Sequence, residues 1–286
     1  MATLLQADTL DWSRRQADDS VDLVFCSPPY EAQRTYGIGF DLRGQAWVDW
    51  AVERFVEHVR ICRGLVAWVV EGQTKKFRWS ATPALFMADI HRRGIKLRKP
   101  PIYRRNGIMG SGGPDWLRND YEFIVCASKG RLPWSNNTAM GRPPKCPPGG
   151  APSHQSSDGR VNKPRLQRVG GERVIKLYKP PTLANPGNVI NCGVVGGGNM
   201  GSDLAHENEA PFPEKLAEFF VLSFCPPGGT VCDAFCGSCT TGAAAVRHGR
   251  NFIGTDVRES QIELSRRRLA EVQLTIESLQ KAKASV

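Results

Sequence analysis

Ser27, Pro28, Pro29 and Tyr30 form a tetrapeptide suited to binding an aromatic amine. The apolar run at 21–26 predicts a buried strand of a parallel sheet, and the prolines end it because neither can donate to a sheet ladder. Open α/β sheets bind ligands at such carboxyl ends. The Pro28 carbonyl and Ser27 hydroxyl could accept hydrogen bonds from an amine, and the Tyr30 ring could stack on a planar base. A simple strand followed by a proline turn is the alternative interpretation.

A second stretch whose residues could take part in binding or catalysis lies near the carboxyl end of the chain. Residues 229–233 predict a strand, 234–239 a tight turn of mostly small residues, and 240–246 the start of a helix. The next predicted strand, 250–256, ends on Asp256, which follows Asp233 by 23 positions. This is the pattern of a nucleoside-binding βαβ unit, in which the backbone of the turn approaches the ligand and the acid binds ribose hydroxyls.

Together the two stretches resemble the amino-group DNA methyltransferases, which methylate exocyclic amines with S-adenosylmethionine. Ser-Pro-Pro-Tyr at 27–30 matches their catalytic motif, and Asp-Ala-Phe-Cys-Gly-Ser-Cys-Thr-Thr at 233–241 matches their cofactor loop. The catalytic block precedes the cofactor block, which is the permuted order of the beta class. Ala234 and Cys239 replace a proline and a glycine of the family pattern, so Cys239 would be strained if its backbone adopts angles that favour glycine.

The resemblance implies an α/β fold, with a Rossmann-like methyltransferase sheet, helices on both faces, circularly permuted motif order and an inserted target-recognition region. It implies catalytic roles for the tetrapeptide Ser27, Pro28, Pro29 and Tyr30, and no metal site. It also implies eight cofactor-binding residues: Asp8, Phe212, Asp233, Phe235, Gly237, Ser238, Thr240 and Asp256. Asp8 could equally cap a helix over 9–15. Phe212 belongs to a stretch, 206–216, similar to the block that packs against the methionine end of the cofactor.

The mechanism that the resemblance implies is direct methyl transfer to a base flipped out of the duplex. Tyr30 would stack on this base, while Ser27 and the Pro28 carbonyl would orient its amine toward the methyl sulfonium. No covalent nucleophile is needed, so Cys26 is not one. A serine at the first motif position usually accompanies N4-methylation of cytosine in this family, which we expect here. N6-methylation of adenine is the alternative, and a catalytically silent DNA-binding protein is a more distant one.

Charge and composition favour a nucleic-acid partner. The formal net charge is +10 and the pI is about 9.3. Residues 129–179 carry 11 lysines and arginines against only Asp158 and Glu172, and they are dense in proline, glycine and serine. This segment is interpreted as a target-recognition insertion that contacts double-stranded DNA, with an inert linker as the alternative. We expect catalytic and cofactor halves at 1–130 and 206–286, an insertion at 131–205, and a monomer or homodimer.

The chain lacks a signal peptide and a long apolar run, and its nine cysteines are scattered, which predicts a cytoplasmic protein with reduced thiols and no membrane span. Cys232, Cys236 and Cys239 have the spacing found in radical S-adenosylmethionine enzymes, whose thiolates hold an iron–sulfur cluster. Against this interpretation, Cys232 lies inside an apolar strand, and Ser238 stands where those enzymes have an aromatic residue.

The remaining patterns predict the elements that position these motifs. Helical spacing or helix-end signals occur at 47–60, 83–93, 214–224 and 259–284, and strands are expected at 4–8, 64–70 and from 120. Trp47 and Trp50 are interpreted as packing residues. The segment 31–44 is predicted to form a loop beside the base pocket. Tyr121 or Glu122 could line that pocket, although packing within a strand explains them equally.

Overall fold

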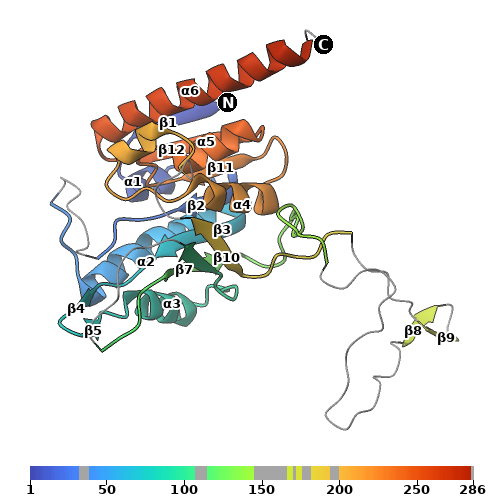
Figure 1. The fold of residues 1–286 in the computed structure, drawn as a ribbon. Helices are drawn as coiled ribbons and strands as arrows, with labels where there is room; N and C mark the ends of the chain where they lie inside the picture. Colours follow the sequence, from blue (N-terminus) through green and yellow to red (C-terminus); the bar gives the residue numbers. More distant parts are fainter. Residues whose placement is uncertain are drawn as a thin grey trace.

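The computed structural model describes residues 1–31, 39–106, 115–144, 166–169, 172–175, 182–193 and 200–284. Within these residues an eight-stranded sheet runs in the order β1-β12-β11-β2-β3-β7-β6-β10, with helices on both faces (Figure 1). Its strands are β1 (Ala2–Gln6), β2 (Val21–Cys26), β3 (Cys62–Val70), β6 (Ile102–Asn106), β7 (Tyr121–Ala127), β10 (Val189–Gly193), β11 (Thr230–Asp233) and β12 (Asn251–Asp256). Short pairs are formed by β4 (Thr74–Lys75) with β5 (Arg78–Trp79), and by β8 (Leu166–Val169) with β9 (Glu172–Ile175).

Neighbouring strands of the eight-stranded sheet are parallel except β7, which is antiparallel to both β3 and β6. The helices are α1 (Thr9–Arg14), α2 (Gly44–Ile61), α3 (Thr82–Arg92), α4 (Glu214–Phe224), α5 (Thr240–Arg247) and α6 (Glu259–Ala284), with a 3₁₀ turn, η1, at Asp203–Glu207. This mixed sheet with helices on both faces confirms the predicted fold class.

Two hydrophobic layers cover the sheet because side chains alternate between its faces. Along β2, Leu23 and Phe25 join one buried cluster, whereas Val24 and Cys26 join the other. The first cluster includes buried residues of α4, α5 and α6, and the second includes residues of α1, α2 and α3. The helices that follow β2 and β11 therefore cover opposite faces, which opens a crevice between the carboxyl ends of these adjacent strands.

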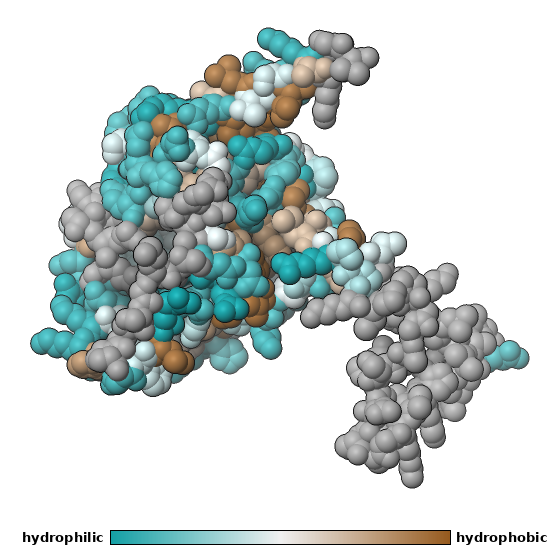
Figure 2. Space-filling view, in the orientation of Figure 1, coloured by the Kyte–Doolittle hydropathy of each residue, from teal (hydrophilic) through white to brown (hydrophobic). Residues whose placement is uncertain are grey.

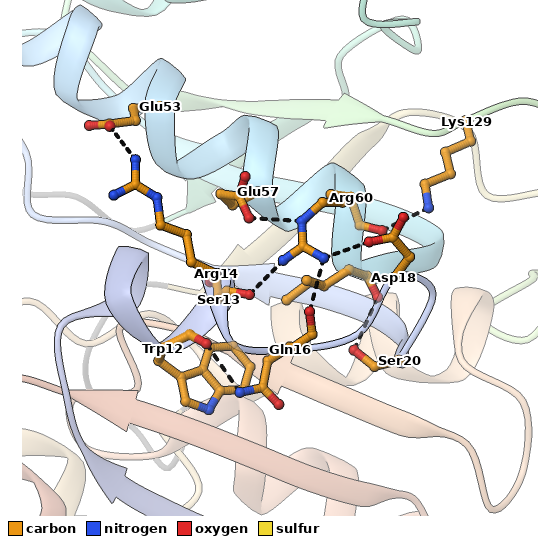
Figure 3. Close-up of polar contacts among 11 residues, drawn as sticks. Trp12, Ser13, Arg14, Gln16, Asp18, Ser20, Glu53, Glu57, Arg60 and Lys129 are labelled. Atoms are coloured by element: carbon orange, nitrogen blue, oxygen red, sulfur yellow. Dashed lines mark hydrogen bonds and ion pairs between the residues drawn. The ribbon is translucent and has the colours of Figure 1, made fainter.

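Arg60 near the end of α2 fixes the connection between α1 and β2 (Figure 3). Its guanidinium donates to the Ser13 carbonyl at 2.7 Å, the Gln16 carbonyl at 2.9 Å and the Asp18 carboxylate at 2.6 Å. The bond to Asp18 is the largest of the influences that raise the pKa of Arg60. These contacts hold α1, and with it the turn after β1, against α2.

Most predicted elements of the sheet are confirmed, with two differences. The first strand ends at Gln6 and not at Asp8, because the Asp8 carboxylate accepts bonds from the backbone N–H groups of Leu10 and Asp11 and so caps α1. The strands expected from the sequence include neither β6 nor β10, which pair with each other at one edge of the sheet. Of the five residues of β10, only Val189 and Ile190 are typical strand formers, so little local pattern marks this strand.

Much of the predicted insertion lies outside the described residues, as do 32–38 of the predicted loop beside the base pocket and 107–114. Strand β10 falls inside the predicted insertion, 131–205, but belongs to the main sheet. The division of the chain into three parts at 131 and 205 stays a prediction. Apolar side chains reach the surface along α6 (Figure 2), where Leu274 and Leu279 are exposed. Among the described residues, no helix combines the length and apolar character that crossing a membrane requires.

Candidate active site and cofactor pocket

A single cavity lies at the carboxyl ends of the central strands and brings both sequence motifs together. The turn after β2 contributes Ser27, Pro28 and Pro29, and the loop after β11 contributes Phe235, Gly237, Ser238 and Thr240. Asp8, Asp256 and Phe212 also line this cavity. Of the twelve residues predicted for the site, only Tyr30 and Asp233 are absent from its wall.

Residues of α2 and α3 form hydrogen bonds that hold the tetrapeptide and the residue after it. Trp47, which is buried, donates its indole N–H to the Pro29 carbonyl at 2.9 Å. Glu31 follows the tetrapeptide and is buried as well; its carboxylate accepts from the Gly44 N–H at 2.7 Å and from the Thr82 hydroxyl at 3.3 Å. The prolines restrict the turn covalently, and these bonds fix its exit, so Ser27 is presented by a rigid backbone.

Tyr30 is half-buried and reaches across to β7. Its hydroxyl donates to Glu122 Oε2 at 2.8 Å, and the same carboxylate pairs with Arg105 of β6 at 3.2 Å. The ring of Tyr30 is therefore anchored at its hydroxyl by a residue 92 positions away in the chain. This bond ties the turn after β2 to β7.

The loop after β11 has the strained backbone that its sequence predicted. Cys239 has φ 63° and ψ 35°, a left-handed conformation that favours glycine and costs another residue on the order of 1 kcal/mol. Gly237 is also left-handed, with φ 48°. A Cβ at Gly237 would lie 2.9 Å from Asn208 Nδ2, so any other residue would displace the Asn208 side chain as well as adopt a strained backbone angle.

Asp233 supports the loop from inside the protein. It is 2% exposed, and its Oδ1 accepts from the Phe235 N–H at 3.1 Å. Burial raises the pKa of this carboxyl to about 7, against the opposing effect of hydrogen bonds from Thr241 and Phe235. Asp233 therefore shapes the turn that carries Phe235 and Gly237, and it does not itself face the cavity.

Asp256 at the end of β12 forms a charged wall of the cavity together with Arg258. Its Oδ2 accepts from the Gly237 N–H at 3.2 Å, and its Oδ1 accepts from the Arg258 N–H at 3.0 Å. Arg258 also binds the Glu209 carboxylate at 2.9 and 3.1 Å. The Asp256 carboxylate thus connects the glycine loop to the segment 208–212, which forms another wall of the cavity.

Asp8 serves as a helix cap and as part of the cavity wall, so the two alternatives for this residue do not exclude one another. Its Oδ2 pairs with Arg54 at 3.2 Å, and the Arg54 guanidinium lies 4.5 Å from the centre of the Trp50 ring. Its neighbour Thr9 also lines the cavity and bonds to His58 Nε2 at 3.1 Å. The cofactor-binding role of Asp8 stays a prediction.

His58 is an uncharged support behind this wall. Burial, followed by the nearby charge of Arg54, lowers its pKa to about 3. Trp68 donates its indole N–H to His58 Nδ1 at 3.0 Å, so in the neutral ring Nε2 carries the proton and donates to the Thr9 hydroxyl. This assignment of the tautomer follows from the hydrogen-bond partners.

Several lining residues were missed by sequence reasoning. Phe40, Trp50, Asn208 and Arg258 all face the cavity. Trp50 was interpreted as a packing residue because it lies on a helix with apolar spacing, and its ring does pack, 5.0 Å from Phe40 and 5.8 Å from Phe235. A ring that packs on neighbours and also faces a cavity has the same spacing as a core residue, so no sequence signal distinguishes the two.

The three cysteines with cluster-like spacing do not converge. Cys232 belongs to the hydrophobic cluster on the α2 face of the sheet, whereas Cys236 and Cys239 belong to the cluster on the opposite face. All three are buried, and burial is the main cause that raises the pKa of each thiol. The part of the chain that the structure describes contains no group of three or more side chains that could hold a metal ion.

The cavity suits a nucleoside with a charged tail. The rings of Phe40, Trp50 and Phe235 offer apolar faces to a planar base, and the carboxylates of Asp8 and Asp256 can accept bonds from hydroxyl or amino groups. The backbone of the glycine loop allows a ligand to approach closely. These groups fit S-adenosylmethionine, because its adenosine part requires an apolar face for the base and acceptors for the ribose hydroxyls, and its methionine part carries an amino group.

The chain is similar to known DNA methyltransferases. The family described as DNA methylase, of the N6/N4 type, matches residues 21–267. The orphan methyltransferase M.BamHII of Bacillus amyloliquefaciens is 30% identical over 264 residues, covering 88% of this chain and 89% of its own. The DNA adenine methyltransferase YhdJ of Escherichia coli K12 is 27% identical over 278 residues, covering 93% and 82%.

Solved structures share the fold. PvuII DNA methyltransferase (cytosine-N4-specific) superimposes with a TM-score of 0.67 at 18% identity, over 93% of this chain and 86% of that one. The Thermus thermophilus protein TTHA0409, solved with S-adenosyl-L-methionine, gives a TM-score of 0.58 at 20% identity, over 95% of this chain and 94% of that one.

The fold and the cavity define a class, the S-adenosylmethionine-dependent methyltransferases. Within this class the chain belongs to the N6/N4 amino DNA methyltransferase family. It is a DNA methyltransferase, and its substrate is DNA.

Proposed function

We propose that this enzyme transfers the methyl group of S-adenosylmethionine to the N4 amine of a cytosine flipped out of double-stranded DNA, at a specific recognition site. The observation that carries this proposal is the shared cavity: Ser27 and Pro28 line it together with Gly237 and Asp256. Acceptors for an amine and a cradle for a nucleoside therefore face the same space. Attack by an amine on a methyl donor needs this proximity more than it needs any further catalytic group.

The cofactor would be held from three sides of the cavity. Phe235 contributes an apolar face for adenine, and Asp256 accepts bonds from the ribose hydroxyls while Gly237 and Ser238 allow close approach of the backbone. Phe212 borders the remaining wall, where the methionine end would lie. When bound, S-adenosylmethionine supplies an electrophilic methyl group on a positively charged sulfur.

The protein's own groups would prepare the amine of the target base. The two N–H groups of the amine donate hydrogen bonds to the Ser27 hydroxyl and the Pro28 carbonyl, which draws the nitrogen lone pair out of conjugation with the ring. Tyr30 stacks on the base, and its bond to Glu122 keeps the ring in place. The base must leave the duplex because its amine is inaccessible while it is stacked and paired.

N6-methylation of adenine is the second candidate. The serine at position 27 supports cytosine through the family resemblance, and the structural neighbour PvuII methyltransferase is cytosine-N4-specific. In favour of adenine, the relative YhdJ is named as an adenine methyltransferase. Both bases present a planar amine that an acceptor pair can bind, so the tetrapeptide alone does not separate them.

Nucleoside analysis tests the proposal directly. The purified chain is incubated with S-adenosylmethionine carrying a deuterated methyl group and with genomic DNA from a strain without methyltransferases. The DNA is then digested to nucleosides for mass spectrometry. Deuterated N4-methyldeoxycytidine is expected. N6-methyldeoxyadenosine alone would overturn the choice of base, and the absence of both products would favour a silent DNA-binding protein.

The basic insertion is proposed to contact the DNA backbone. Neutralised phosphates release counterions, so the logarithm of DNA affinity should fall linearly with the logarithm of salt concentration. Replacing Arg160, Lys163 and Arg165 together by glutamine is expected to reduce this slope. These three residues lie outside the described part of the chain. An unchanged slope would remove the insertion from the DNA interface.

A further inference from the structure

Arg268 of α6 is a fully buried arginine with an extensive set of partners. Its exposure is 0%, and its guanidinium donates to the Ser238 carbonyl at 3.1 Å, the Thr240 hydroxyl at 2.9 Å and the Met200 carbonyl at 2.6 Å. The Glu214 carboxylate, which is also paired with Arg247, accepts a fourth bond at 3.2 Å. A buried charge is costly unless it is paired in this way, so these contacts together hold Arg268 in place.

Two of these contacts bracket the strained position of the cofactor loop. One nitrogen, Nη1, binds both Ser238 and Thr240, the residues on either side of the left-handed Cys239. Ser238 and Thr240 line the cavity, whereas the Cys239 side chain is buried in the core. No side-chain bond caps α5 at Cys239. If the backbone at Cys239 relaxed toward angles that suit a cysteine, both flanking residues would shift in the cavity wall.

We propose that Arg268 is a positioning residue that stabilises the left-handed turn at Cys239 and so keeps the cofactor loop in its binding geometry. The inference rests on the proposed assignment of this loop to the cofactor. Arg268 lies 30 positions after Ser238, and it acts through the loop without touching the cofactor. The arginine is needed because position 239 carries a side chain; with glycine there, the same turn would be free of strain.

Titration calorimetry of S-adenosylmethionine into single and double variants tests this coupling. Arg268→Lys keeps a charge beside Glu214 but cannot reach both flanking residues, so we expect affinity about tenfold weaker, the size of one lost hydrogen bond. In a Cys239→Gly background, Arg268→Lys should weaken the affinity by less than about threefold, because the backbone strain at position 239 is gone. In a Cys239→Ala background, which removes the thiol but keeps the Cβ, Arg268→Lys should still weaken the affinity by about tenfold.

The proposal would be overturned if Arg268→Lys weakened the affinity equally with cysteine, glycine and alanine at position 239, or if it weakened the affinity in none of these backgrounds. Arg266→Met serves as the matched control, since Arg266 lies on the same helix and its contacts to Glu259 and Glu263 are exposed; its affinity should equal that of the parent. Arg268→Gln gives the same test without a charge if the lysine variant fails to fold. If Asp256→Ala leaves affinity unchanged as well, the assignment of the cavity is wrong, and not only the role of Arg268.

Discussion

The turns that follow β2 and β11 lie at the same edge of the sheet, on adjacent parallel strands, yet they are held in different ways. The tetrapeptide after β2 is stiffened by two prolines, and its exit is fixed by the bond from Trp47 to the Pro29 carbonyl and by the bonds that the Glu31 carboxylate accepts. The loop after β11 bends through left-handed residues and depends on charged groups, among them Asp256 and the buried Arg268. Two prolines stiffen the turn that we propose performs the chemistry, whereas left-handed residues and a network of hydrogen bonds fix the turn that we propose holds the cofactor.

This difference predicts that the two turns can be disabled separately. Changes in the tetrapeptide should affect turnover and leave cofactor affinity intact, because its acceptors are needed only where the amine reacts. Changes in the loop should affect affinity, because the network shapes the ground-state cradle. A tetrapeptide variant that weakens cofactor affinity, or a loop variant that lowers turnover without weakening affinity, would show that the two turns act as one unit.

The largest effect is expected for Ser27→Ala. Loss of an acceptor that stabilises the transition state should lower turnover by about 10²-fold or more, with little change in cofactor affinity. Steady-state methyl transfer and titration calorimetry measure the two quantities. Ser278→Ala, on the exposed surface of α6, should leave both unchanged. If Ser27→Ala remained fully active, the serine would be only a turn residue, and the Pro28 carbonyl would orient the amine alone.

The next largest effect is expected for Asp256→Ala. The variant loses the proposed bonds to the ribose hydroxyls as well as the contacts to Gly237 and Arg258. Charge-assisted bonds of this kind contribute about 1.5–3 kcal/mol, so affinity for S-adenosylmethionine should weaken by roughly 10- to 100-fold. Glu263→Ala is a control from the exposed face of α6. An affinity within twofold of the parent would remove Asp256 from the cofactor site.

A smaller effect is expected where the tetrapeptide meets β7. Tyr30→Phe and Glu122→Ala each break the bond between the Tyr30 hydroxyl and the Glu122 carboxylate, so each should lower turnover by about tenfold. Because both remove one shared contact, the double variant should be little worse than either single one. Fully additive losses in the methyl-transfer rate would show that the two residues act independently.

The smallest effect is expected for Trp47→Phe. Loss of the bond to the Pro29 carbonyl should lower the free energy of unfolding by about 1 kcal/mol beyond the cost of the smaller ring, measured by urea denaturation. Trp116→Phe is the control, since Trp116 is 77% exposed. Equal stability of both variants would contradict a supporting role for the Trp47 indole.

Sequence patterns predicted the local parts of this site better than its long-range contacts. The strand before Ser27 and the turn at 233–241 follow from residue types within a few positions, whereas the strain at Cys239 follows from the family resemblance, and all three are confirmed. Arg268 could not be found in this way. It lies in a run of three arginines on an amphipathic helix, of which only Arg268 is fully buried, and nothing local marks which one turns inward.

The same limit applies to Glu122 and Asn208. Glu122 was considered for the base pocket, but its bond to Tyr30 depends on how β7 inserts antiparallel between β3 and β6, which no local pattern specifies. Asn208 reaches Gly237 only because the segment 208–212 folds back over the loop. Contacts between elements that are far apart in the chain are set by topology, and topology is the part that local periodicity does not encode.

Single-turnover methyl transfer at saturating S-adenosylmethionine tests the division between the two turns most directly. With enzyme in excess over DNA, Asp256→Ala should recover a transfer rate close to that of the parent, because mass action restores the bound cofactor. Ser27→Ala should stay about 100-fold slower at every cofactor concentration, since its defect lies in the reacting geometry. A slow Asp256→Ala enzyme at saturation, or rescue of Ser27→Ala by added cofactor, would contradict the separate roles of the two turns.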